Sequence, residues 1–161
     1  MFGSFPRQWP ALDVRAGALP FRLGQAGQSE VLLIRRLGRD DWSIPKGRLM
    51  AFREPHEAAR IEAHEEAGIY GRVRSDPLGS YLHVKAPGAY GRRNEVVEVV
   101  VFPLEVDRIA ATWPEMAIRE RQWLPPGDAI TLVDSEKLRE MIAGFAPAVA
   151  DPRIVLEANA S

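Results

Sequence analysis

Short apolar stretches alternate with turn-forming residues along most of the chain, which predicts several strands. Residues 31–34 form a continuous apolar run, typical of a buried strand. Residues 94–106 have the densest β-branched composition and predict a central strand, with Pro103 limiting the ladder near its end. Further strands are expected at residues 11–23 (interrupted near Gly17 and Pro20), at residues 71–84 and at residues 119–124.

Helical signals occupy two longer segments and one short one. The first segment has Pro55 in its opening turn, four alanines and a closing Gly68, which is a typical C-terminal cap. Ser135 is expected to cap a second helix that runs to about residue 145, and a short helix is expected at residues 127–132. Expected loops are the charged segment 35–41, the flexible basic pair Lys46-Gly47, the hairpin loop 86–93 and residues 107–118.

The order strands, helix, strands, helix predicts an α/β fold in which a mixed sheet lies between helices, an α/β/α sandwich. We expect an N-terminal arm at residues 1–10, one domain at residues 11–145 and a loosely attached C-terminal tail at residues 146–161.

Composition narrows the function classes without naming one. The formal net charge is −1 in 161 residues, so no bulk attraction to a nucleic acid polymer or to a membrane is expected. Because cysteine is absent, disulfides and thiolate nucleophiles are excluded. The first ten residues lack the apolar core of a signal peptide, and no apolar run approaches the ~20 residues of a membrane span. We therefore expect a cytoplasmic protein.

Three carboxylates give the chain its chemistry. Glu62, Glu65 and Glu66 are spaced three and four residues apart, so a helix places all three on one face. Like charges at this spacing repel unless a cation lies between them. Clustered carboxylate oxygens suit Mg²⁺, or alternatively Mn²⁺. A solvated acidic helix face is the alternative interpretation.

The segment from Gly47 to Ile69 resembles the Nudix box, the signature of a family of diphosphate hydrolases. Gly47, Glu62, Glu65, Glu66 and Gly68 fall on its register. Two positions depart from it, because Arg53 stands where the first Glu is expected and Ile61 stands where an Arg is expected. In the family that Arg helps to hold the glutamates. The resemblance implies the Nudix-type α/β/α sandwich and a metal site of Gly47, Glu62, Glu65 and Glu66.

A second tier of similarity lies outside the box. Residues 14–22 and the late pattern of Trp113, Glu115, Arg119 or Arg121, Trp123 and Leu124 resemble the diphosphoinositol polyphosphate and diadenosine polyphosphate phosphohydrolase branch. This implies metal-dependent cleavage of a phosphoanhydride in a small polyphosphorylated substrate. Two alternatives stay open: a house-cleaning hydrolase of nucleoside triphosphates or nucleotide sugars, and a non-catalytic nucleotide-binding regulator. A homodimer is common in such families, although no residue here indicates one.

The predicted site residues are of two kinds, catalytic carboxylates and substrate-binding cations. The catalytic candidates are Glu62, Glu65 and Glu66, and Glu66 is the preferred proton acceptor, with Glu115 and Glu120 as alternatives. A polyphosphate needs cationic partners, and the predicted ones are Arg15, Arg22, Lys46, Arg48, Arg92 and Arg93. Lys85 belongs to the same basic hairpin. His83 and the other histidines are expected to be isolated, on the surface or partly buried.

Overall fold

The computed structural model describes residues 12–85 and 95–149 of the chain. The strands are β1 (Asp13–Leu23), β2 (Ser29–Arg36), β3 (Lys46–Arg48), β4 (Ile69–Val73), β5 (Gly79–Lys85), β6 (Glu95–Ile109) and β7 (Arg119–Leu124). The helices are α1 (Pro55–Ala67), α2 (Pro126–Ala129) and α3 (Glu136–Val149). Within the described part of the chain, no helix is long and apolar enough to cross a membrane.

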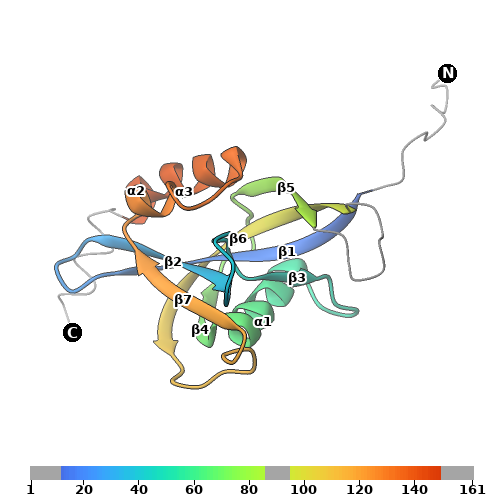
Figure 1. Ribbon diagram of the computed structural model, residues 1–161, viewed down its shortest axis with the longest axis horizontal. Helices are drawn as coiled ribbons and strands as arrows, with labels where there is room; N and C mark the ends of the chain where they lie inside the picture. The colour runs from blue at the N-terminus through green and yellow to red at the C-terminus, as the bar shows by residue number, and fades with distance from the viewer. Residues whose placement is uncertain (1–11, 86–94, 150–161) are drawn as a thin grey trace.

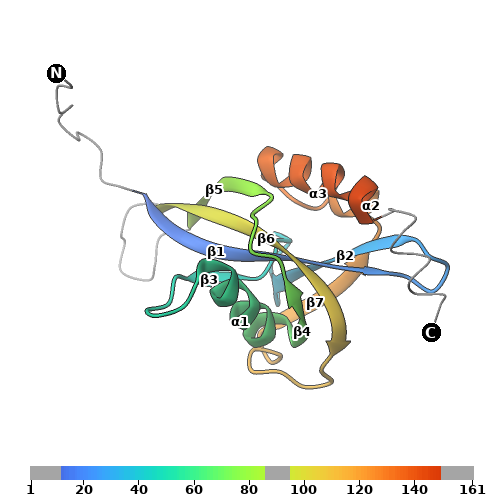
Figure 2. The same cartoon turned by 180° about the vertical axis from the view of Figure 1, so that it is seen from behind.

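One mixed sheet holds all of these strands. Its main path runs β4-β6-β1-β2-β7, while β3 adds to β1 and β5 adds to β6. β1 and β6 are parallel over nine paired positions, from Asp13↔Val97 to Phe21↔Glu105, and the remaining pairs are antiparallel. Helix α1 covers one face and α2 with α3 covers the other, as both ribbon views show (Figures 1 and 2). The predicted α/β/α sandwich is therefore confirmed.

The two central strands, β1 and β2, are buried on both faces, which explains their near-continuous apolar sequence. Along β1, Leu19 and Phe21 point into the core under α3, whereas Ala16 and Ala18 point into the core under α1. Side chains alternate across a strand, so each helix receives every second residue. The α1 core uses small residues, and the helix therefore lies close to the sheet.

The first strand is continuous, and the predicted interruption near Gly17 and Pro20 is wrong. β3 pairs with β1 up to Gly17, and β2 pairs with it from Phe21 onward. Pro20 lies between these two paired stretches, so its missing N–H removes no bond from either ladder.

Three further predictions required correction at the sheet. The basic pair Lys46-Gly47 is not a flexible loop, because it belongs to β3 and pairs with Ala16 and Gly17 of β1. Residues 71–84 form parts of two strands, since β4 and β5 both pair with the 15-residue β6 at different ends. β6 itself continues to Ile109, into the segment expected to be a loop.

The C-terminal helices agree with the prediction except at their ends. α2 covers Pro126–Ala129, shorter than the expected 127–132. In α3 the Leu138 N–H donates to Ser135 Oγ at 3.2 Å, which is the expected N-terminal cap, and the helix continues to Val149. The predicted arm at residues 1–10 and loop at residues 86–93 lie outside the described residues, as does the tail beyond residue 149.

Two glycines provide a matched test of this packing. A Cβ at Gly71 would lie 2.0 Å from the Glu105 carbonyl oxygen, whereas a Cβ at Gly144 on α3 meets nothing within 4 Å. We expect Gly71→Ala to lower the free energy of unfolding by about 2–3 kcal/mol, because a backbone atom cannot yield cheaply. Gly144→Ala should raise it by about 0.5–1 kcal/mol through helix propensity. Thermal unfolding followed by circular dichroism measures both, and equal effects would contradict the packing described.

Candidate active site

Helix α1 presents the carboxylates, and its ends are fixed by the residues that the sequence indicates. Pro55 lies in the first turn, and Gly68 ends the helix in the left-handed conformation with φ of 65°. Ala58, Ala59, Ala63 and Ala67 are fully buried against the sheet. With that face packed, the glutamates are directed along the edge of the helix, toward β3 and β7.

Glu66 is the most buried of these carboxylates, with 7% of its surface exposed. Both of its oxygens accept hydrogen bonds: Oε2 from the Lys46 backbone N–H at 3.1 Å and Oε1 from Arg119 Nη2 at 2.9 Å. Burial raises the pKa of Glu66, while the Arg119 guanidinium and the Lys46 N–H oppose that rise. Strands β3 and β7 together therefore hold this side chain in one orientation.

Glu62 lies directly against the backbone of β3. A Cβ at Gly47 would come within 2.1 Å of the Glu62 carboxyl carbon, so any other residue here would displace that carboxyl group. Burial, followed by the neighbouring Glu66, Glu65 and Glu115 carboxylates, raises the pKa of Glu62 to about 7. The cluster therefore carries more negative charge than its protein partners balance.

Of the two alternative proton acceptors, only Glu115 lies in this cluster. Arg119 Nε donates to Glu115 Oε1 at 3.1 Å, and the Glu115 backbone N–H donates to the Glu65 carbonyl at 3.0 Å. Glu120 instead pairs with Arg35. The structure thus favours Glu115 over Glu120 as a participant.

The carboxylates are neighbours, but they do not converge on one point. Among residues 12–85 and 95–149, no three acidic or histidine side chains form a group that could hold a metal ion as arranged. The cation that links Glu66 to Glu115 in this structure is the Arg119 guanidinium. The donor set is nevertheless of the kind that an oxygen-preferring divalent ion takes, because the Glu62 carboxylate lies against the Gly47 backbone and has Glu65, Glu66 and Glu115 as neighbours.

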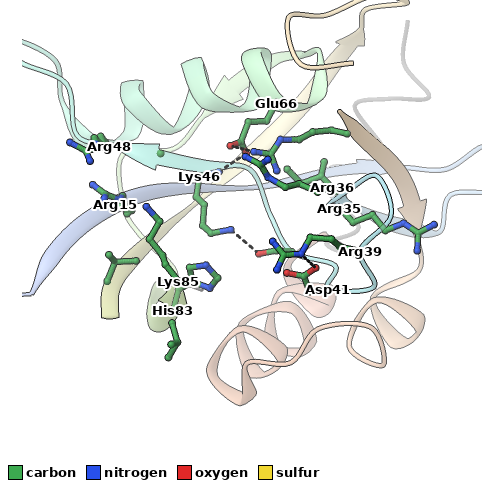
Figure 3. A pocket seen from close by; sticks show the side chains of 16 residues that line it. Arg15, Arg35, Arg36, Arg39, Asp41, Lys46, Arg48, Glu66, His83 and Lys85 are labelled. Atoms are coloured by element: carbon green, nitrogen blue, oxygen red, sulfur yellow. Dashed lines mark hydrogen bonds and ion pairs between the residues drawn. The ribbon is translucent and has the colours of Figure 1, made fainter. Parts of the chain in front are cut away.

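A basic cavity of about 760 Å³ opens beside the cluster (Figure 3). Both Glu66 and Gly47 line it, and its cationic wall consists of Arg15, Arg35, Arg36, Arg39, Lys46, Arg48, Lys85 and Arg119. Arg15 is 5% exposed, and its Nη2 has no hydrogen-bond partner among the described residues. The same Nη2 is 3.0 Å from Asp13 Oδ2, a contact without hydrogen-bond geometry.

Burial, with neighbouring cations, lowers the pKa values of Lys46 and His83 in this cavity. Burial lowers the pKa of Lys46, Glu66 opposes the effect, and Arg119 adds to it. Burial also lowers the pKa of His83, and Lys46 and Lys85 add to that effect. Both groups would gain from an anion in the cavity. His83, expected to be isolated, is therefore part of this wall.

Only some of the predicted substrate-binding cations line the cavity. Arg15, Lys46 and Arg48 line the cavity, whereas Arg22 does not. Arg22 Nε pairs with Glu30 at 3.2 Å, and its guanidinium lies over the Trp123 ring, 4.0 Å from the centroid. Arg92 and Arg93 lie outside the described residues. Arg35, Arg36 and Arg39 also line the cavity, although they were not predicted as substrate-binding cations. Their only sequence signal is the charged run 35–41.

The late Trp-Pro-Glu segment docks on the C-terminal end of α1. Trp113 Nε1 donates to the Glu66 carbonyl at 3.0 Å, and Arg121 Nη1 donates to the Ala67 carbonyl at 2.6 Å. The Arg121 guanidinium lies over the Trp113 ring, 3.9 Å from its centroid. Because the last carbonyls of a helix lack partners within it, these donors stabilise the turn that carries Glu65 and Glu66.

Comparison with known sequences gives one family. The family model described as NUDIX domain matches residues 12–145. Nudix hydrolase 13, mitochondrial, of Arabidopsis thaliana is 30% identical over 157 residues, covering 84% of this chain and 74% of the relative. Human diphosphoinositol polyphosphate phosphohydrolase 2 is 32% identical over 143 residues, covering 83% and 73%.

Solved structures agree on the fold. The binary complex of the C. elegans Ap4A hydrolase has a TM-score of 0.62 at 21% identity and covers 86% of this chain and 98% of its own. The NUDIX domain of Shewanella oneidensis NrtR, complexed with ADP ribose, has a TM-score of 0.61 at 15% identity, covering 87% and 92%. At these identities the likeness concerns the fold alone.

Glu62 gives the cluster a pH-dependent cost that can be measured without any ligand. Its pKa is about 7 in the folded protein against an ordinary 4.5, so the folded state binds the extra proton between these values. Stability therefore falls as the pH rises through this window. We expect metal-free Glu62→Gln to melt a few degrees above wild type at pH 8, with the difference vanishing toward pH 5.

Scanning calorimetry in a chelator across pH 5–8 tests this expectation. Glu57→Gln removes a carboxylate from the first turn of the same helix, away from the cluster, and serves as the matched control. A gain in Glu62→Gln that is constant with pH would contradict the origin assigned to it.

Proposed function

The chain belongs to the NUDIX domain family of Nudix hydrolases, and from this premise we propose that it cleaves a phosphoanhydride bond in a small polyphosphorylated substrate, with a divalent metal ion as cofactor. Relatives include proteins named for diphosphoinositol polyphosphate. A diadenosine polyphosphate or a diphosphoinositol polyphosphate is therefore the proposed substrate class.

One observation carries the proposal: the carboxylate cluster and a buried arginine, whose Nη2 forms no hydrogen bond with a described residue, line the same cavity. Glu66 and Gly47 form one side of it, and Arg15 projects an unpartnered Nη2 from another. A buried Nη2 that forms no hydrogen bond is costly even beside the Asp13 carboxylate, and the oxygen of an anionic ligand would accept that bond. A phosphate chain supplies such oxygens and can extend from Arg15 to the glutamates.

The metal requirement follows from the donor set. Glu62, Glu65 and Glu66, with the backbone of Gly47, would hold Mg²⁺ or Mn²⁺. When bound, the ion would neutralise charge on the phosphates and lower the pKa of the attacking water. The chain itself orients the phosphates through Arg15, Lys46 and Arg48, which come from the paired strands β1 and β3.

The proton acceptor is better assigned to Glu62 than to Glu66. Both oxygens of Glu66 already accept hydrogen bonds from Lys46 and Arg119. The Glu62 carboxylate lies beside Gly47 and accepts no hydrogen bond from a described residue, so it is free to take a proton. Glu115 remains the alternative because it shares Arg119 with Glu66.

A substrate panel tests the activity directly. It holds diadenosine penta- and hexaphosphate, an inositol pyrophosphate, nucleoside triphosphates and ADP-ribose, each with Mg²⁺ or Mn²⁺, with products resolved by anion exchange. We expect cleavage of the long polyphosphates and its loss in Glu66→Gln. Cleavage of triphosphates alone would discard the substrate class, and no turnover with any compound would indicate a nucleotide-binding regulator.

The cationic wall makes a separate prediction with an internal control. Arg15→Met should raise KM by about 10–100-fold, the effect expected for a lost charge-assisted hydrogen bond to phosphate. Arg22→Met removes a cation from the same strand but outside the cavity, and it should leave KM unchanged. Equal effects of the two substitutions on KM would remove the cavity from the substrate site.

The cytoplasmic location and the homodimer are not tested by these findings. Three of the Arabidopsis relatives are named as mitochondrial and one as chloroplastic, and the cytoplasmic location of this chain stays a prediction. The homodimer likewise stays a prediction.

A further inference from the structure

Helix α1 supplies no cation to its own carboxylates. Arg60 is its only Lys or Arg; it is exposed and forms no ion pair with a described residue. The positions one turn before Glu66 are Glu62 and Ala63, of which the first is acidic and the second is fully buried. A partner for Glu66 therefore has to come from elsewhere in the fold.

Arg119, the first residue of β7, is that partner. Its guanidinium bridges two carboxylates, with Nη2 2.9 Å from Glu66 Oε1 and Nε 3.1 Å from Glu115 Oε1. The Arg119 and Glu66 side chains are 14% and 9% exposed, so water competes little for this contact. A planar fork with two fixed bonds sets the direction of a carboxylate more narrowly than a single ammonium does.

The second Glu66 oxygen is fixed from the opposite side. The Lys46 N–H that binds Oε2 belongs to β3, whose position is set by its ladder with β1. Glu66 therefore stands between a backbone donor that cannot rotate and a guanidinium anchored on Glu115. Groups that hydrogen-bond to a metal ligand fix the orientation in which that ligand binds the metal.

We propose that Arg119 is a positioning residue that holds Glu66 in its metal-binding orientation, a task for which α1 has no cation of its own. The inference rests on the proposed function, since it takes Glu66 as a ligand of the ion. Arg119 acts through Glu66 and is not itself assigned contact with the reacting atoms.

A purely electrostatic role and a positioning role for Arg119 predict opposite changes in metal affinity when Arg119 is removed. Removing a positive charge next to a cation site should tighten binding of a divalent ion. Removing a positioning group should weaken it, because the free carboxylate then samples orientations that do not ligate. The direction of the change in metal affinity separates the two roles, and it requires no turnover.

The experiment measures Mn²⁺ affinity of the full chain by electron paramagnetic resonance and by titration calorimetry. We expect the Kd to rise about tenfold in Arg119→Met, the lower end for loss of a group that orients a metal ligand. Arg119→Lys keeps the positive charge but loses the two-pronged guanidinium. Its Mn²⁺ Kd should lie between those of Arg119→Met and wild type. Should Arg119→Met unfold, Arg119→Lys carries the same test.

Arg36→Met is the matched control. Arg36 lies opposite Arg119 in the β2–β7 ladder and lines the same cavity, but it forms no ion pair among the described residues. Its loss should leave the Mn²⁺ Kd unchanged or slightly lower. If Arg119→Met behaves like Arg36→Met, the positioning role is wrong.

Glu66→Gln separates failure of this inference from failure of the proposed function. If wild type binds Mn²⁺ and Glu66→Gln abolishes binding, the metal site stands, and Arg119 is judged on its own variants. If wild type binds no Mn²⁺, the proposed function fails, and the inference fails with it.

Discussion

A buried carboxylate organises the candidate site of this molecule. Glu66 is nearly removed from water, and an ionised carboxylate in that position is tolerated only when both oxygens have partners. The partners come from two different strands, the Lys46 N–H of β3 and the Arg119 guanidinium of β7. Satisfying this one group therefore requires α1, β3 and β7 to meet, and the basic cavity forms where they do.

Small residues allow that meeting. α1 packs through four fully buried alanines onto Ala16 and Ala18 of β1, which brings the helix close to the sheet. At Gly47 the approach is closest, since the Glu62 carboxyl occupies the place where a Cβ would stand. Glycine at this position leaves room for the Glu62 carboxyl group, which a residue with a Cβ would displace. The packing thus sets how near the carboxylates come to the backbone of β3.

Opposite charges lie side by side without cancelling. Burial and neighbouring carboxylates raise the pKa of Glu62, whereas burial and neighbouring cations lower the pKa values of Lys46 and His83. Arg119 belongs to both groups, because it bonds the acidic cluster and lines the basic cavity. A folded chain accepts such separated excesses when a ligand later neutralises each of them, and the ligands proposed here are a divalent cation and a phosphate chain.

The sequence by itself determined the elements and the chemistry of α1. Spacing placed Glu62, Glu65 and Glu66 on one face, and Pro55 and Gly68 marked its ends, because helix periodicity and capping are local properties. The sequence also determined the strand character of β2, β6 and β7, because apolar runs, β-branched composition and alternation are local properties as well. Only the tertiary structure decided that Lys46-Gly47 is a strand, that Arg22 belongs to Glu30 and Trp123, and that Arg119 belongs to Glu66. Those assignments join residues that are far apart in the chain, such as Arg119 with Glu66 and Arg22 with Trp123, and the sheet register that brings them together has no signature in the local pattern.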